Sequence, residues 1–115
     1  DLIGKTTVSV LSGDDFSFLG LLAQGGVGCI SVVSNVDPAR TVATYESFIA
    51  GRTTEATQHL KALFPLMQFL FSESNPVPCK AAMEQMGLCN RAVRLPLAPF
   101  SGPAPVELLN SLGLL

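Results

Sequence analysis

Two short apolar runs stand out in the first third of the sequence. Residues 6–11 (TTVSVL) are β-branched and apolar and end at a Ser-Gly-Asp-Asp stretch, and residues 29–33 (CISVV) form a second continuous apolar run. Strands of parallel sheets, which are covered on both faces, show such runs without polar alternation. The pattern therefore predicts two buried strands.

Each run is followed by a helical pattern of apolar positions. The first pattern covers residues 16–24, after an Asp-Asp cap and before a Gly-Gly pair. The second begins at Asp37, which precedes the proline favoured at a first helical position, and runs to Ala50 with Gly51 as its stop. The order strand, helix, strand, helix predicts a βαβα unit whose two strands are parallel neighbours.

After Gly51 the pattern is helical and strand-like runs cease. Helices are predicted at residues 54–71, 79–86 and 106–112. Pro65 lies inside the first of these helices and is predicted to kink it. Extended, proline-rich connectors are predicted at residues 75–78 and 94–99.

The two predicted strands need more sheet than this sequence supplies. Two parallel strands that are buried on both faces do not form a sheet by themselves, because parallel sheets need further strands and helices to cover them. We therefore expect an α/β fold in which residues 1–51 are the end of a larger sheet structure, followed by a helical domain over residues 52–115.

Composition excludes several classes of protein. Of the 115 residues, 48% are apolar and 14% are charged, and the formal net charge is −2. A disordered tail would have low hydrophobicity and high charge, and a nucleic-acid module would have a basic excess. Residues 16–36 carry no charge, but their pattern changes from helical to strand-like at a glycine turn, so we expect two buried elements and no membrane span.

The metal-ligating residue types are sparse. Cys29, Cys79 and Cys89 have no metal-like spacing, and His59 is the single histidine. We expect three free, mainly buried thiols, no metal and no cofactor. Free cysteines fit a reducing compartment, which favours the cytoplasm and leaves a plastid open.

Candidate binding residues lie where the predicted strands end, which is where parallel α/β folds hold ligands. Gly13 permits close approach of a ligand to the backbone, although the same Ser-Gly-Asp-Asp stretch can simply cap a helix. Asn75 is either a binding group or a turn residue. None of the three lysines, Lys5, Lys61 and Lys80, occupies a desolvated strand position suited to Schiff-base chemistry.

Four segments in this order resemble the C-terminal part of the dihydrodipicolinate synthase family, also called 4-hydroxy-tetrahydrodipicolinate synthases. The segments are VLSGDD (residues 10–15), GGVGCISVVSN (25–35), ESNPVPCKAAMEQMGL (73–88) and RLPLAP (94–99). The resemblance implies a (β/α)8 TIM barrel, of which this chain supplies the last two βα units and the small C-terminal helical domain. It also implies a homotetramer and an N-terminal barrel segment, with the first six strands, outside this sequence.

The resemblance further implies a pyruvate-dependent lyase of lysine and diaminopimelate biosynthesis. A strand lysine upstream of this sequence would form a Schiff base with pyruvate, and the enamine would attack aspartate semialdehyde. No catalytic residue of the family maps onto this chain, so the chain alone is expected to be inactive. Ile30 matches a position whose backbone carbonyl lies near the pyruvate adduct, and Gly13, Asp14 and Asn75 match positions near the second substrate.

Two other functions stay open. The chain could belong to another pyruvate lyase resembling the N-acetylneuraminate lyases, in which Asp14 and Asn75 would line a different aldehyde pocket. It could also be a catalytically empty chain that acts only in assembly. No nucleic-acid or membrane partner is expected.

Overall fold

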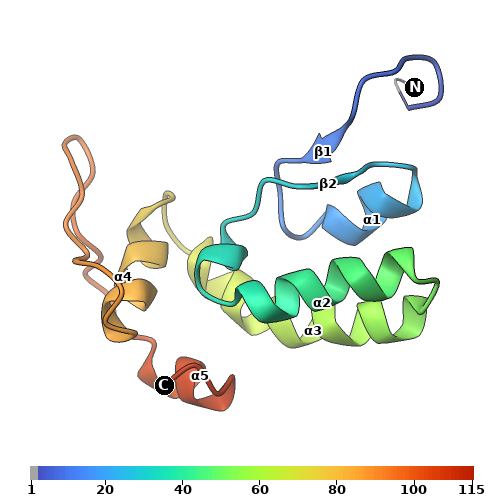
Figure 1. The fold of residues 1–115 in the computed structure, drawn as a ribbon. Helices are drawn as coiled ribbons and strands as arrows, with labels where there is room; N and C mark the ends of the chain where they lie inside the picture. The colour runs from blue at the N-terminus through green and yellow to red at the C-terminus, as the bar shows by residue number, and fades with distance from the viewer. Residues whose placement is uncertain (1–2) are drawn as a thin grey trace.

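The computed structural model describes residues 3–115 and places two short strands side by side (Figure 1). Strand β1 (Leu11–Ser12) pairs in parallel with β2 (Gly28–Cys29), with Leu11 opposite Gly28 and Ser12 opposite Cys29. Helix α1 (Phe18–Ala23) forms the crossover between them. The predicted order of strand, helix and parallel strand is confirmed.

The predicted lengths of the strands are wrong. Of residues 6–11 only Leu11 is in a strand of the two-stranded sheet, and of residues 29–33 only Cys29 is. Each strand has one neighbouring strand within residues 3–115, so the hydrogen-bonded ladder between them is short. Two backbone hydrogen bonds extend it at its ends, from Val27 N–H to Val10 O and from Ile30 N–H to Ser12 O. The elements of residues 3–115 do not bury this stretch by themselves, because Val8 is 67% exposed.

The second strand ends early for a specific reason. After Cys29 the chain turns into the 3₁₀ helix η1 (Val33–Asn35), where the sequence predicts continued strand. The buried carboxylate of Asp15 accepts hydrogen bonds from the backbone amides of Val32 and Val33 and so holds this turn. A side chain distant in sequence thus overrides the local β preference.

The helix boundaries around residue 37 follow their predicted caps. Helix α2 (Pro38–Ile49) begins after Asp37, whose side chain accepts a hydrogen bond from Arg40 N–H at 3.0 Å. Gly51 has a φ of 77° just after the helix, a conformation that glycine adopts without a Cβ clash. Both predicted signals are confirmed.

Helix α3 (Thr53–Leu70) packs along α2 and carries most of the core (Figure 1). It continues through Pro65 as one helix. Its inner face meets η1, helix α4 (Val77–Gln85) and helix α5 (Val106–Ser111). The largest fully buried apolar side chains are Leu63, Leu66, Met67, Leu70, Leu109, Val33 and Val36.

The connectors around α4 differ from their predictions. The predicted extended stretch 75–78 is wrong at Val77 and Pro78, which form the first turn of α4. Proline is tolerated there because first-turn amides have no partner within the helix. Residues 94–99 are not fully extended either, since Leu97 N–H bonds to Arg94 O and closes a turn.

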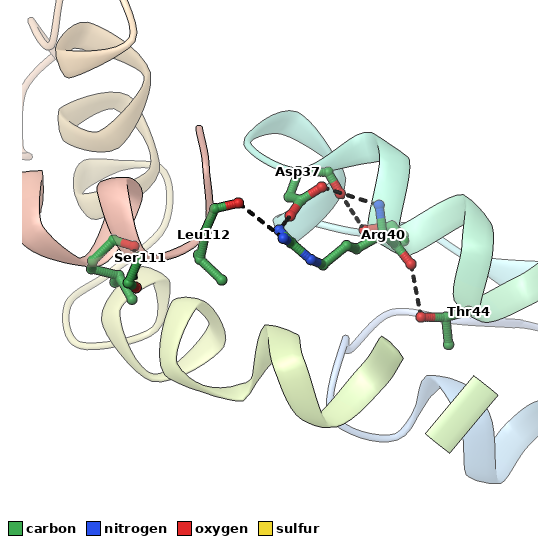
Figure 2. A network of polar contacts seen from close by, with 7 residues as sticks. Asp37, Arg40, Thr44, Ser111 and Leu112 are labelled. Carbon is green, nitrogen blue, oxygen red and sulfur yellow. Dashed lines mark hydrogen bonds and ion pairs between the residues drawn. The ribbon is translucent and has the colours of Figure 1, made fainter. Parts of the chain in front are cut away.

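A polar network ties the start of α2 to the end of the chain (Figure 2). The Arg40 guanidinium pairs with the buried Asp37 carboxylate, and its Nη2 donates to the backbone oxygen of Leu112 at 2.9 Å. Thr44 Oγ1 donates to Arg40 O at 2.8 Å. The C-terminal helix is therefore fixed to α2 by hydrogen bonds as well as by apolar packing.

No helix within residues 3–115 combines the length and the apolar character needed to cross a membrane.

Candidate functional site

A hollow of about 490 Å³ lies where the two strands end. Its wall comes from three places: the loop after β1, the turn after β2, and the segment that begins α4. The lining residues are Gly13, Ile30, Ser31, Val32, Asn35, Asn75, Pro76, Cys79, Lys80 and Met83. The carboxyl ends of parallel strands meet at one edge of a sheet, which explains why the two strand-end segments share this hollow.

Three of the four substrate-contact residues expected from the resemblance lie together here. Gly13, Ile30 and Asn75 all line the hollow, although Asn75 is far away in sequence. The Ile30 side chain is 71% exposed. The fourth residue, Asp14, does not line the hollow, and its Oδ2 accepts a hydrogen bond from Ser17 N–H at 2.8 Å in the turn before α1. The roles of all four in substrate binding stay predictions.

A buried carboxylate behind the hollow belongs to Asp15, which the sequence suggests only as an alternative helix cap. Its side chain is almost fully buried, at 3% exposure. One carboxylate oxygen accepts from the Ser31 hydroxyl, and the other accepts from Val32 N–H at 2.9 Å and from Val33 N–H at 3.4 Å. These bonds fix the turn that carries Ile30.

Two side chains from α4 close the hollow on the other side. The thiol of Cys79 lies 4.0 Å from Val32 O and 3.9 Å from the Met83 sulfur. Burial, followed by the charges of Cys89 and Asp15, raises the pKa of the Cys79 thiol. The Lys80 ammonium donates to Ala92 O.

Cys29 lies at the end of β2 on the other side of the same turn. Burial, followed by the negative charge of Asp15, raises the pKa of the Cys29 thiol to about 11. Its Sγ donates a weak hydrogen bond to Asp14 O at 3.9 Å. The thiol is therefore protonated near neutral pH and behaves as a small apolar side chain. All three cysteines are free, but the expectation that they are mainly buried is wrong, because only Cys79 is buried and Cys29 and Cys89 are half-buried.

The other residues with reactive side chains lie outside the hollow. His59 faces Glu55 on α3 at 3.7 Å, and Lys61 is exposed on the same helix. Within residues 3–115 no group of three His, Cys, Asp or Glu side chains is arranged to hold a metal ion. The polar residues among the lining of the hollow are Ser31, Asn35, Asn75 and Lys80. Together with the backbone groups of the strand ends they suit the binding of a small polar molecule, although the Lys80 ammonium itself is bonded to Ala92 O.

Comparison with known proteins gives one consistent result. The sequence matches the dihydrodipicolinate synthetase family over residues 3–112. A 4-hydroxy-tetrahydrodipicolinate synthase of Thermomicrobium roseum is 46% identical over 104 residues, which are 90% of this chain and 34% of that protein. The chain thus spans about a third of the length of this relative.

Solved structures agree with the sequence match. The dihydrodipicolinate synthase of Thermotoga maritima superposes with a TM-score of 0.89 at 40% identity, over 93% of this chain and 37% of that one. The Acinetobacter baumannii enzyme, solved as a complex with pyruvate, superposes with a TM-score of 0.81 at 34% identity, over 93% of this chain and 37% of that one.

Proposed function

Because the chain belongs to the dihydrodipicolinate synthetase family, we propose that it is the C-terminal part of a pyruvate-dependent 4-hydroxy-tetrahydrodipicolinate synthase. The proposed reaction joins pyruvate to aspartate semialdehyde in lysine and diaminopimelate biosynthesis. The observation that carries the proposal is the meeting of Gly13, Ile30 and Asn75 in one hollow at the strand ends. These are the positions that the resemblance associates with the two substrates.

In the proposed architecture, residues 1–51 are the last two βα units of a (β/α)8 barrel and residues 52–115 are the C-terminal helical domain. Exposed apolar side chains on and beside the short sheet support this arrangement, because further strands would cover them. Val8, Leu11, Val27 and Ile30 are 67%, 47%, 47% and 71% exposed. A homotetramer in the cytoplasm is part of the same proposal.

The proposed chemistry begins outside this chain. A lysine amine of the upstream barrel condenses with the pyruvate ketone, releases water and forms an imine. Loss of a methyl proton gives an enamine, whose carbon attacks the aldehyde of the second substrate. The backbone carbonyl of Ile30 lies beside the pyruvate adduct, and Gly13 and Asn75 lie beside the aldehyde substrate. Asp14, which lies outside the hollow, is assigned to the aldehyde side by the family resemblance alone. Their task is to position the reactants rather than to move electrons.

Reductive trapping tests this proposal. The full polypeptide that carries these residues is incubated with pyruvate and borohydride, and the product is examined by intact-mass and peptide-mass spectrometry. We expect one pyruvate adduct, on a lysine outside residues 1–115. The isolated chain of 12.1 kDa should form no specific adduct. Absence of an adduct from the full polypeptide would contradict the proposal.

Aldehyde specificity separates this function from a sugar-acid lyase. Aspartate semialdehyde should be consumed with pyruvate, whereas N-acetylmannosamine should not. Turnover of the sugar instead would assign the chain to the alternative lyase. A catalytically empty assembly chain would give neither turnover nor adduct.

A further inference from the structure

We propose that Asp15 is a positioning residue of the synthase, which holds the Ile30 peptide at the geometry that the pyruvate adduct requires. This inference rests on the proposed function, because it assigns Ile30 to the pyruvate side of the site. Asp15 itself does not line the hollow. Its effect on the reaction is therefore exerted through the turn that follows β2.

The side-chain hydrogen bonds of Asp15, which lies in the loop before α1, do not go to that helix. Its carboxylate accepts from Ser31, Val32 and Val33, all in the turn after the neighbouring strand. The neighbouring Asp14 performs the local task, since its carboxylate accepts from Ser17 N–H before α1. Two adjacent carboxylates thus have separate partners, and only that of Asp15 joins the two strand ends.

The Ile30 peptide is held from both sides. On one side Ile30 N–H donates to Ser12 O at 2.8 Å, which continues the strand pairing. On the other side Asp15 holds the next two residues, through the Ser31 hydroxyl and the Val32 amide. Without the carboxylate, the ladder would still fix the Ile30 amide, but the carbonyl side of this residue would lose the contacts that tie it to the loop after β1.

Charge supports the same role. Asp15 is 3% exposed, and its partners among residues 3–115 are one hydroxyl and two backbone amides. A buried carboxylate without such donors would be costly, so its three bonds are expected to be held tightly. Tight bonds from a buried group give the fixed geometry that a reacting group needs.

The test measures kcat for each pyruvate-binding site rather than for each milligram of protein. Borohydride trapping counts the competent sites in the full polypeptide, and kcat is divided by that number. Three variants are compared: Asp15→Ala removes the acceptors, Asp15→Asn keeps an amide oxygen for Val32 and Val33, and Asp37→Asn is the matched control. Asp37 is also buried and also accepts from a backbone amide, but its carboxylate bonds to Arg40, which does not line the hollow, whereas Asp15 bonds to Ser31 and Val32, which do.

We expect Asp15→Ala to lower kcat per trapped site by about 10- to 100-fold, as a shift of the order of 1 Å in a positioned group does. Asp15→Asn should restore most of this loss, and Asp37→Asn should leave kcat per trapped site unchanged. Hydrogen exchange of the amides of Val32 and Val33 should quicken in Asp15→Ala alone.

Two results would overturn the inference, and they are distinguishable. If Asp15→Ala traps fewer sites but keeps the wild-type kcat per trapped site, Asp15 is only structural and the proposed function stands. If the wild-type polypeptide traps no pyruvate, the proposed function fails and the inference fails with it.

Discussion

The buried carboxylate of Asp15 accepts a hydrogen bond from the backbone amide of Val32 at 2.9 Å. This contact joins the loop after the first strand to the turn after the second. The strands themselves are two residues long, so strand pairing alone gives the rim of the hollow little rigidity. The polar contact supplies it, and a ligand in the hollow would meet a backbone held by a side chain behind it.

The ion pair of Arg40 with the buried Asp37 should contribute more to stability than the exposed ion pair of Arg52 with Glu55. Asp37 is buried, and Arg40 also donates to Leu112 O. Arg40→Met leaves a buried carboxylate partly unpaired, so we expect the free energy of unfolding to fall by about 1–3 kcal/mol. Urea unfolding of the full polypeptide measures this change.

Arg52→Met is the matched control for Arg40→Met. Arg52 pairs with Glu55 at the same three-residue spacing, but both side chains are about half exposed. Screening by water should keep the loss for Arg52→Met well below the loss for Arg40→Met. Equal losses in the two variants would show that the network to Leu112 adds nothing.

Two glycines near α1 should respond in opposite directions to alanine. A Cβ on Gly26 would lie 2.5 Å from Leu21 Cγ, so Gly26→Ala should destabilise the protein by about 1–3 kcal/mol. A Cβ on Gly20, inside α1, would meet nothing within 4 Å, and Gly20→Ala should stabilise it by about 0.5–1 kcal/mol. Thermal unfolding of both variants checks the signs, and two shifts in the same direction would contradict the account.

Cys29 should react slowly with alkylating reagents. Burial and the charge of Asp15 raise its pKa to about 11, against 9.0 for an ordinary thiol. Two pKa units reduce the thiolate fraction near neutral pH by about 100-fold, and the alkylation rate should fall similarly relative to an unfolded peptide. Asp15→Asn removes a negative charge, so it should lower this pKa and speed the reaction. Alkylation followed by peptide-mass spectrometry across pH 7–11 measures both effects.

The same pKa predicts a dependence of stability on pH. Unfolding returns the Cys29 thiol to its ordinary pKa, so above about pH 9 the unfolded state binds fewer protons than the folded state. This contribution therefore makes stability fall as pH rises from about 9 to about 11. Cys29→Ala should flatten that part of the curve. An unchanged slope in the variant would assign the loss to other groups.

Asn75 should affect the second substrate more than pyruvate. It enters the hollow from the segment before α4, opposite the strand ends. We expect Asn75→Ala to raise KM for aspartate semialdehyde by about tenfold, because the variant loses one or two hydrogen bonds to this substrate. Pyruvate trapping should be unchanged. Asn110→Ala, on the exposed face of α5, is the control and should alter neither. A selective loss of pyruvate trapping in Asn75→Ala would contradict this assignment.

Local signals predicted the helices well because their causes are local. The Asp37 cap, the stop at Gly51 and the apolar repeat of α3 act over a few residues. Strand length failed because a ladder needs neighbours, and Val33 entered a 3₁₀ turn because Asp15 captures its amide. Pro78 is predicted in an extended connector but lies in the first turn of α4, because proline is common in both places.

The site was only partly accessible to sequence reasoning. Gly13 and Asn75 are candidates from their positions in the sequence, Ile30 is a candidate only through the family resemblance, and the structure brings all three to one hollow. Asp15 and Cys79 were not selected, since their importance comes from burial and from partners distant in sequence. The sequence offers one signal for Asp15: it is a second acidic residue after the predicted strand, beyond the one that a helix cap needs.

Peptide-resolved hydrogen exchange of the full polypeptide with and without pyruvate tests most directly whether the hollow belongs to the substrate site. We expect pyruvate to slow exchange in residues 28–36 and 73–80, which carry most of the lining of the hollow, and to leave the middle of α3 unchanged. Protection confined to other segments, or none despite a trapped adduct, would contradict the placement of this hollow in the substrate site.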